Sequence, residues 1–382
     1  MPSGDIRVVD AVCNSQTAAW CPPTCETRGR PLRVACADTG FGNRILNWLA
    51  PAVYGRVLHR PIVTFWATPK NTGGRRHFGM RHYGELSALR ELVDMPYDLQ
   101  FIEDWPVSRR GAGVSSSKAF GALTLKQSDY VPVNSLNNFP NSMPGYGFFT
   151  PESAWEYWQG WAKHRVWPAP NNCTSYAEFA LAFRAVFDDF RPRIDLQNPP
   201  PRSYLAMHVR EGDKRRVSTD AAATVLRLAQ HVSQRTGLSW LVISDNETAA
   251  AEVNAEMQRQ GIAVLPPRVP LSISTASPSP PISLRAVVRD FFALSAAAGV
   301  LLQTSPFGGW IDSSFSSTAA AVGDAPLLLP ARSAKGGSMA SLQALTNASG
   351  LPLHSCFFKD QLEAFQQEVE ACRKRPFKGP AR

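Results

Sequence analysis

An apolar run, Tyr204-Leu205-Ala206-Met207, ends in the charged heptad His208-Val209-Arg210-Glu211-Gly212-Asp213-Lys214, which is the most informative stretch of the sequence. The apolar run predicts a strand and the residues from Ala221 onward predict a helix, so the heptad falls in the turn after a strand. Open α/β sheets hold their ligands at that edge. A guanidinium there can bind a phosphate through two parallel hydrogen bonds. The heptad alone leaves two interpretations open, a ligand site and a solvated turn with a surface ion pair.

Strands and helices alternate on both sides of the heptad. Ahead of it, we expect a βαβ unit made of a strand at 32–36, a helix at 43–58 and a strand at 61–66. After it, we expect strands at 238–244, 261–265, 299–304 and 327–329, which alternate with helices at 220–235, 247–260, 284–297 and from 313 onward. Such alternation predicts an α/β fold with parallel, doubly wound sheets.

The composition agrees with a large folded enzyme. The 382 residues, 44% apolar and 10% aromatic, suffice for two α/β domains with sizeable cores. The net charge of +9 suits an anionic partner, but the basic residues are scattered and only Arg373-Lys374-Arg375 forms a patch, which argues against nucleic acid. No apolar run approaches the roughly 20 residues of a membrane span.

Two further segments complete an ordered set with the heptad. They are Leu241-Val242-Ile243-Ser244-Asp245-Asn246 and the stretch from Asp290 to Ser316, which contains Ser313-Ser314-Phe315-Ser316. The three segments resemble the three motifs shared by the α1,6-, α1,2- and protein O-fucosyltransferases. This resemblance covers roughly residues 200 to 325 and implies a GT-B fold, in which two Rossmann-like doubly wound domains face a cleft.

The sequence pattern divides the chain into four parts, and the resemblance implies their roles. The predicted parts are an irregular cysteine-containing extension (1–30), an acceptor-side α/β domain with long loops (31–198), a donor-binding Rossmann-like domain (199–350) and a closing helix with a basic tail (351–382). The proline-rich stretch that ends at Pro201 marks the central boundary, because it breaks any helix. In GT-B relatives a closing helix crosses back to the first domain.

The resemblance also implies roles for single residues. Arg210 matches the arginine that neutralises the β-phosphate of the GDP leaving group. Ser313, Ser314 and Phe315 stand at the start of an Ala-rich helix, where hydroxyls and backbone amides could hold the same diphosphate. Simple N-capping by the two serines would coexist with that role.

Guanine recognition falls to two other positions by the same resemblance. His208 and Asp290 match residues that read the guanine base in the α1,6 branch. Asp290 could instead form a structural ion pair with Arg289.

A glycine-containing turn in the first half supplies three more candidates for the donor site. Gly40, Gly42 and Asn43 lie between the first expected strand and helix. The glycines would allow close approach of the backbone to a ligand, and Asn43 would cap the helix. The turn resembles the Gly-x-Gly-Asn of many fucosyltransferases, and a plain strand-to-helix turn is the alternative.

The catalytic base is not defined by the sequence. The α1,6 enzymes carry a glutamate ten residues after the motif histidine, where this chain has Ser218. Glu211, Asp213, Asp220 and Asp38 are the available carboxylates. Asp213 is also placed to orient Arg210.

No Asp-x-Asp occurs in the chain, which argues against a manganese-dependent enzyme, so we expect no metal and no cofactor beyond the GDP-fucose donor. The acceptor would be a glycan or a protein. Two alternatives remain, a GT-B enzyme that uses another nucleotide sugar and an inactive sugar-nucleotide- or glycan-binding protein, the latter suggested by Ser218.

The compartment stays open between two expectations. Eukaryotic relatives usually lie in the Golgi or ER lumen behind an N-terminal anchor, and sequons at Asn172, Asn246 and Asn347 favour the lumen slightly. The first residues do not resemble a signal peptide, so the alternative is a cytoplasmic enzyme.

Overall fold

The computed structural model describes part of the chain, and every structural statement below concerns that part. The described residues are 32–34, 41–57, 62–64, 66, 86–97, 99–101, 130–131, 151, 154–155, 175–209, 219–244, 247–266, 283–303, 314–328, 359–375 and 377. They form a mixed α/β structure, which confirms the α/β part of the predicted class.

The first half contains a parallel sheet of short strands in the order β4-β2-β1-β5. Its strands are β1 (Leu32–Val34), β2 (Ile62–Thr64), β4 (Leu99–Phe101) and β5 (Tyr130–Val131). The helices of this half are α3 (Phe41–Val57), α4 (Leu86–Leu92) and α8 (Tyr176–Asp189). Ser175 and Glu178 form a capping box at the start of α8, which satisfies backbone donors there. A small antiparallel pair joins β3 (Val93–Asp94) to β6 (Arg191–Pro192).

The second half contains a parallel sheet in the order β10-β9-β7-β8. Its strands are β7 (Tyr204–Val209), β8 (Ser239–Ser244), β9 (Val300–Gln303) and β10 (Leu327–Leu328). Its helices are α9 (Thr219–Thr236), α10 (Glu247–Arg259), α11 (Leu284–Ala296), α12 (Ser314–Gly323) and α14 (Lys359–Lys374).

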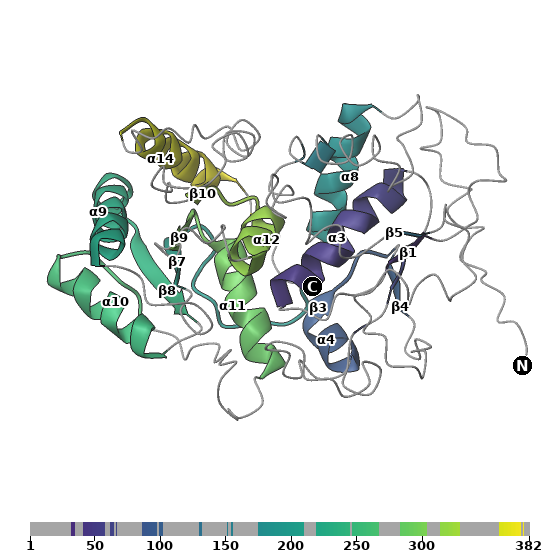
Figure 1. The fold of residues 1–382 in the computed structure, drawn as a ribbon, viewed down its shortest axis with the longest axis horizontal. Coiled ribbons are helices and arrows are strands. Elements are labelled where there is room, and N and C mark those ends of the chain that lie inside the picture. Colours follow the sequence, from purple (N-terminus) through teal and green to yellow (C-terminus); the bar gives the residue numbers. More distant parts are fainter. Residues whose placement is uncertain are drawn as a thin grey trace, which may run out of the picture.

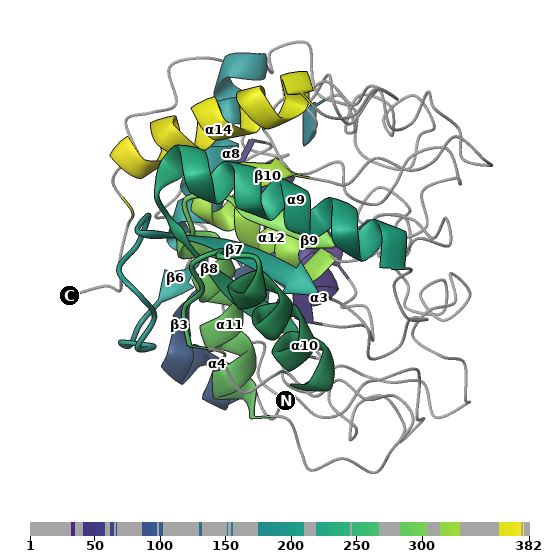
Figure 2. The same ribbon diagram turned by 90° about the vertical axis from the view of Figure 1, so that its left-hand side faces the viewer.

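Helices cover both faces of the second sheet, and β7 shows why. Leu205, Met207 and Val209 pack in one apolar cluster with residues of α9, α10 and α14. Tyr204 and Ala206 pack in another cluster with α11 and α12. Successive side chains of a strand point to opposite faces, so a fully buried strand needs apolar residues at consecutive positions. Figure 2 shows α9, α10 and α14 on one side of this sheet.

Helices α11 and α12 lie between the second sheet and the helices of the first half (Figure 1). Aromatic side chains fill the interface between these helices and those of the first half. The Phe41 ring lies 5.4 Å from Phe291, and the Phe190 ring lies 5.5 Å from Phe292. The apolar core is therefore continuous across residue 198. The division into two domains that face a cleft stays a prediction.

Most of the predicted elements occur with small changes in their bounds. The strand predicted at 261–265 is wrong, because only one bridge forms there, between Trp240 and Val264. The prediction that Asn43 caps a helix is also wrong, since α3 begins at Phe41 and Asn43 lies in its first turn. Packing of Phe41 on Phe291 and Phe315 accounts for the earlier start.

The closing helix α14 packs on α9 and over Gly299. A Cβ added to Gly299 would lie 2.6 Å from Val369 Cγ2 and 2.8 Å from Phe365 Cζ, so a glycine is required for this close approach. Helix α14 (Lys359–Lys374) thus lies over the second sheet. None of the helices in the described ranges has the length and hydrophobicity of a membrane span.

Candidate functional site

His208 lies one residue before the carboxyl end of β7 and faces α12. Its side chain is only 5% exposed, and its Nδ1 lies 3.1 Å from the hydroxyl oxygen of Ser316. Ser316 is completely buried in the first turn of α12. A hydrogen bond to one ring nitrogen fixes the orientation of an imidazole and the chemistry of its other nitrogen. The structure therefore holds His208 rigidly at the edge where α/β sheets bind ligands.

The amino terminus of α12 lies at the same edge. The helix begins at Ser314, and the ring of the next residue, Phe315, lies 5.7 Å from the His208 ring. The helix dipole gives such a terminus a partial positive charge. The chain thus places the positive end of a helix dipole beside the imidazole.

The start of α3 joins this site from the first half. The Phe41 ring lies 6.3 Å from the Phe315 ring, and the hydroxyl of Thr318 lies 3.5 Å from the carbonyl oxygen of Gly42, at the limit of a hydrogen bond. Gly42 is therefore close to α12 even though it precedes it by more than 270 residues. Two helix amino termini, those of α3 and α12, meet near the carboxyl end of β7.

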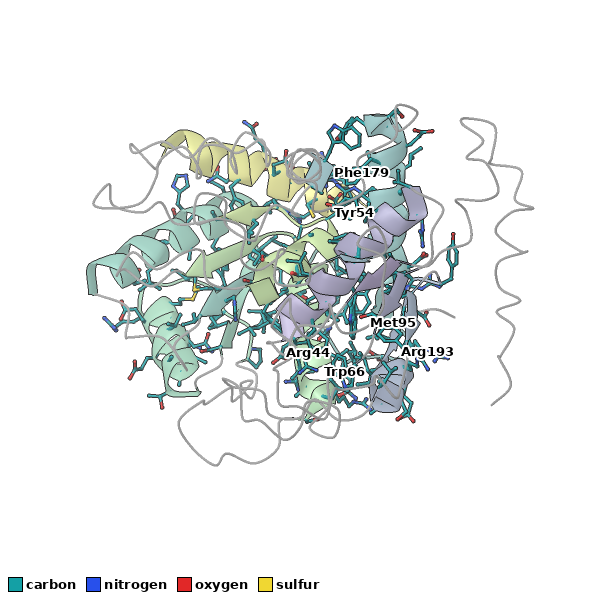
Figure 3. The ribbon with its side chains drawn as sticks, turned by 45° about the vertical axis from the view of Figure 1, so that its right-hand side comes forward. Arg44, Tyr54, Trp66, Met95, Phe179 and Arg193 are labelled. Carbon is teal, nitrogen blue, oxygen red and sulfur yellow. The ribbon has the colours of Figure 1, made fainter. Side chains whose placement is uncertain are left out.

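Arg44 is a charged residue of this region that the sequence did not single out. It lies in the first turn of α3, is nearly completely buried, and stacks over the Trp66 ring at 4.6 Å (Figure 3). Trp66 in turn packs against Trp48 at 5.2 Å. Guanidinium groups on aromatic faces are held in place by the ring quadrupole. The spacing of Arg44 after Phe41 and before Trp48, on one apolar helix face, was the available signal.

Asp290 is completely buried within α11, and Nε of Arg289 donates to its Oδ1 at 3.0 Å. This is the structural ion pair that the sequence offered as the alternative. The next residue, Phe291, contacts Phe315, with 5.5 Å between the ring centres, so Asp290 is adjacent in sequence to a residue that packs at the site. The side chain of Asp290, however, has no surface open to a ligand.

The remaining predicted site residues lie outside what the structure describes. Arg210, Glu211, Asp213, Ser313 and Gly40 belong to this group. For Asn43 and Ser314 only the helical backbone is described. Their predicted roles stay predictions, as do those of His208, Asp290, Phe315 and Gly42 in binding a ligand. Within the described part, no three His, Cys, Asp or Glu side chains gather to form a possible metal site.

Comparison with known proteins adds little to this site. The chain matches no family model and no curated protein. Among solved structures it is similar to a UDP-N-acetylglucosamine 2-epimerase from Rickettsia bellii, at 10% sequence identity and a TM-score of 0.25, over 90% of this chain and 95% of that chain. A likeness at this level defines neither the fold nor the activity of the chain.

Proposed function

We propose that the protein is an inverting, metal-independent glycosyltransferase that moves fucose from GDP-fucose to a hydroxyl group of a glycan or protein. The observation that carries this proposal is the 3.1 Å contact between His208 and Ser316. These residues belong to the first and third segments that resemble fucosyltransferase motifs, and they are 108 positions apart in the sequence. Motifs that serve one substrate must meet in space, and these two do.

The chemistry requires stabilisation of a leaving diphosphate. The bond between fucose C1 and the β-phosphate oxygen breaks, and negative charge builds on that oxygen as the sugar becomes cationic. A donor that is fixed in place at that oxygen lowers the barrier selectively. Arg210 directly follows the last residue of β7 in the sequence, and the amides at the start of α12 lie at the same edge. We assign the neutralisation of GDP to these two groups.

The acceptor hydroxyl must lose its proton as it attacks C1 from the opposite face. A new C1–oxygen bond forms, the proton passes to a carboxylate, and GDP leaves, which inverts the configuration at C1. Glu211 and Asp213 follow the same strand end and are the proposed bases. Asp220, in the first turn of α9, and Asp38 remain alternatives.

The test compares Arg210→Ala with the control Arg259→Ala, which removes an exposed arginine from α10. We expect Arg210→Ala to lower the rate of fucosyl transfer or GDP-fucose hydrolysis by about 100-fold or more, the usual effect of losing a donor to a developing oxyanion. The control should keep its rate, because an exposed ion pair contributes little. A near-normal rate for Arg210→Ala with an intact fold would refute the assignment.

A second candidate function is a sugar-nucleotide- or glycan-binding protein without activity, and Ser218 favours it. This residue stands where the α1,6 enzymes carry their glutamate. Calorimetry with GDP, UDP and GDP-fucose, followed by a turnover assay with the donor that binds, separates the candidates. Binding of GDP-fucose without turnover would support the inactive protein. Preference for UDP would indicate a different donor.

A further inference from the structure

A pocket of about 330 Å³ lies at the end of α12 remote from His208. Its charged lining consists of four arginines and two aspartates, Arg184, Arg191, Arg202, Arg375, Asp188 and Asp324. Arg184 and Arg191 come from the first half of the chain, and Arg202 and Arg375 come from the second. The volume falls at the lower end of the range for small-molecule sites.

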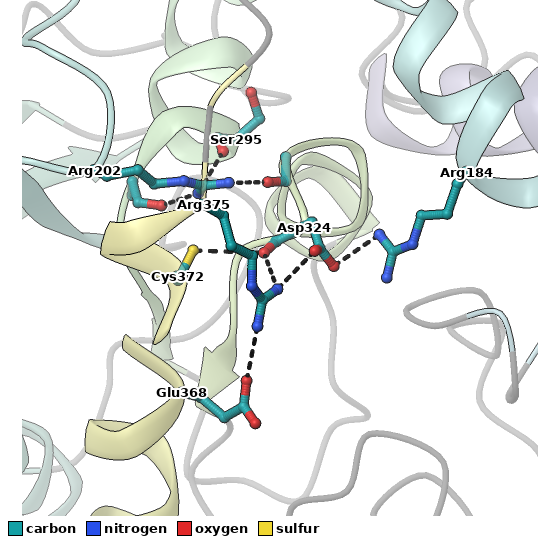
Figure 4. A network of polar contacts seen from close by, with 9 residues as sticks. Arg184, Arg202, Ser295, Asp324, Glu368, Cys372 and Arg375 are labelled. Carbon is teal, nitrogen blue, oxygen red and sulfur yellow. Dashed lines mark hydrogen bonds and ion pairs between the residues drawn. The ribbon is translucent and has the colours of Figure 1, made fainter. Parts of the chain in front are cut away.

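Arg202 forms the back wall of this pocket. It is only 7% exposed, and its guanidinium donates to the carbonyl oxygens of Ser295, Ala297 and Gly323, with 2.5 Å to Ala297 (Figure 4). Burial lowers the pKa of the Arg202 guanidinium below its ordinary range. Because these carbonyls end α11 and α12, Arg202 offsets the negative ends of both helix dipoles. The positive charge of Arg202 is thus compensated by backbone carbonyl groups of the protein itself.

Asp324 binds two other arginines at the mouth of the pocket. Its carboxylate accepts from Arg184 at 2.7 Å and from Arg375 at 2.6 Å (Figure 4). Burial lowers the pKa of Arg375, but the adjacent carboxylate of Asp324 raises it more, so the net direction is upward. These contacts fix two guanidinium groups, one from each half, on either side of a single carboxylate.

Backbone strain is concentrated at the same place. Arg202 has a φ of 62° and Asp324 a φ of 52°, both in the left-handed region that favours glycine. In the described part of the chain only one other non-glycine residue, Gln197, has a positive φ. At Asp324 this conformation ends α12, because the N–H groups of Ala325 and Asp324 donate back to the carbonyl oxygens of Ala320 and Ala321. Two of these three residues line the pocket.

The lining arginines all have partners within the protein. Arg184 pairs with Asp324, Arg191 pairs with Asp94, and Arg375 pairs with both Asp324 and Glu368, so the surroundings of the pocket carry no surplus of positive charge. What Arg184, Arg191 and Arg375 offer a ligand is the N–H groups that these contacts do not use. Each of the three side chains is about 40% exposed. Each guanidinium carries five donors. The contacts to carboxylates described above occupy only some of the nitrogens.

Four phenylalanines also line the pocket, namely Phe187, Phe190, Phe292 and Phe377. The Arg202 guanidinium lies 5.5 Å from the Phe377 ring centre. We propose that this pocket is a second binding site, which takes a small organic anion with a carboxylate or phosphate group on a compact apolar body. The anion would pair with Arg184 and Arg375, and the apolar body would pack on the Phe377 ring, which is partly exposed.

This pocket is distinct from the proposed donor site. Arg202 precedes the amino end of β7, whereas His208 lies near its carboxyl end, roughly 20 Å away along an extended strand. The two ends of α12 are likewise roughly 14 Å apart. The inference therefore does not depend on the proposed transfer reaction.

The experiment measures binding of phenyl phosphate, benzoate and inorganic phosphate to the full chain by calorimetry. We expect Arg184→Gln and Arg375→Gln each to weaken binding of phenyl phosphate about tenfold, the loss expected for one charge-assisted hydrogen bond. Binding should also weaken as salt is added. Arg193→Gln is the matched control, because Arg193 shares Asp94 with Arg191 but does not line the pocket, and it should bind normally.

Three outcomes would overturn the proposal. One is the lack of saturable binding of any of the three probes, which would leave the arginines with only the structural role of holding helix ends. Another is equal affinity in all the variants. The third is displacement of phenyl phosphate by GDP together with loss of binding in Arg210→Ala, which would place the probe in the donor site. If a pocket variant fails to fold, Arg191→Gln replaces it, since Arg191 is half-exposed and lines the same pocket.

Discussion

Replacement of Ser316 by alanine tests whether the contact with His208 organises the site. The substitution removes one hydroxyl and leaves the backbone and Cβ unchanged, so no large cavity forms. The lost bond joins two buried side chains at 3.1 Å. Such a bond contributes about 1 kcal/mol net, and leaving a buried polar atom without its partner costs about 1–3 kcal/mol. We therefore expect the free energy of unfolding to fall by about 1–3 kcal/mol.

The matched control is Ser295→Ala. The Ser295 hydroxyl is equally buried, but it donates at 3.1 Å to the carbonyl oxygen of Phe292 in its own helix. Bonds of this type do not stabilise a helix, so the control should lose clearly less stability. Urea unfolding followed by circular dichroism measures both variants. If His208 contacts the donor, Ser316→Ala also weakens GDP binding, by about tenfold for a loss of 1.4 kcal/mol.

A double-mutant cycle separates the pair from its surroundings. His208→Ala, Ser316→Ala and the double variant should show a coupling energy of about 1 kcal/mol, within the range for residues in contact. Additivity within about 0.3 kcal/mol would show that the two side chains act independently. That result would refute the reasoning that joins the first and third segments into one site.

Three other substitutions test contacts that stabilise the folded protein. Gly323→Ala places a Cβ 1.7 Å from the backbone oxygen of Ser295, so we expect a loss of about 3 kcal/mol in urea unfolding, whereas Gly261→Ala, with a φ of +72° and no atom within 4 Å, should cost about 1 kcal/mol. Asp290→Asn should lower stability by about 1–3 kcal/mol, because it breaks the buried ion pair, and an unchanged melting temperature would argue against that pair. Burial raises the pKa of the Cys372 thiol above its ordinary value of 9.0, so the folded protein keeps a proton that the unfolded chain releases. The contribution of this thiol to the free energy of unfolding is complete below pH 9.0 and is lost as the pH rises toward the pKa of the folded protein. Cys372→Ala should abolish this part of the alkaline loss of stability, as measured by unfolding on either side of pH 9.0.

The elements of the second sheet could be predicted because their signals are local. Strand β7 is buried on both faces, so its residues are apolar in an unbroken run up to His208. The prediction of a strand at 261–265 was wrong for a local reason as well. Trp240 receives a bond from Leu265 and donates to Ala263, which makes a single bridge, and no further residues pair.

The contacts that build the site could not be predicted. The partner of His208 lies 108 residues away and is one of several serines in its segment, so no spacing rule selects Ser316. The burial of Arg44 was indicated only by its place on the apolar face of α3, and a charged residue in the first turn of a helix is normally assigned to solvent. Its stabilising partner, Trp66, belongs to a different part of the chain, just after β2.

Helix α12 joins the His208 contact to the arginine-lined pocket. Its residues from Phe315 to Ala321 are all buried, since the helix is packed between α11, α3 and α8. Small side chains allow this close approach, to the point that the backbone of Gly323 leaves no room for a single added carbon beside Ser295. Ser316 and Asp324 therefore stand at opposite ends of one short helix that neighbouring helices hold on several sides, and this packing fixes the His208 contact at one end and the arginine contacts of Asp324 at the other.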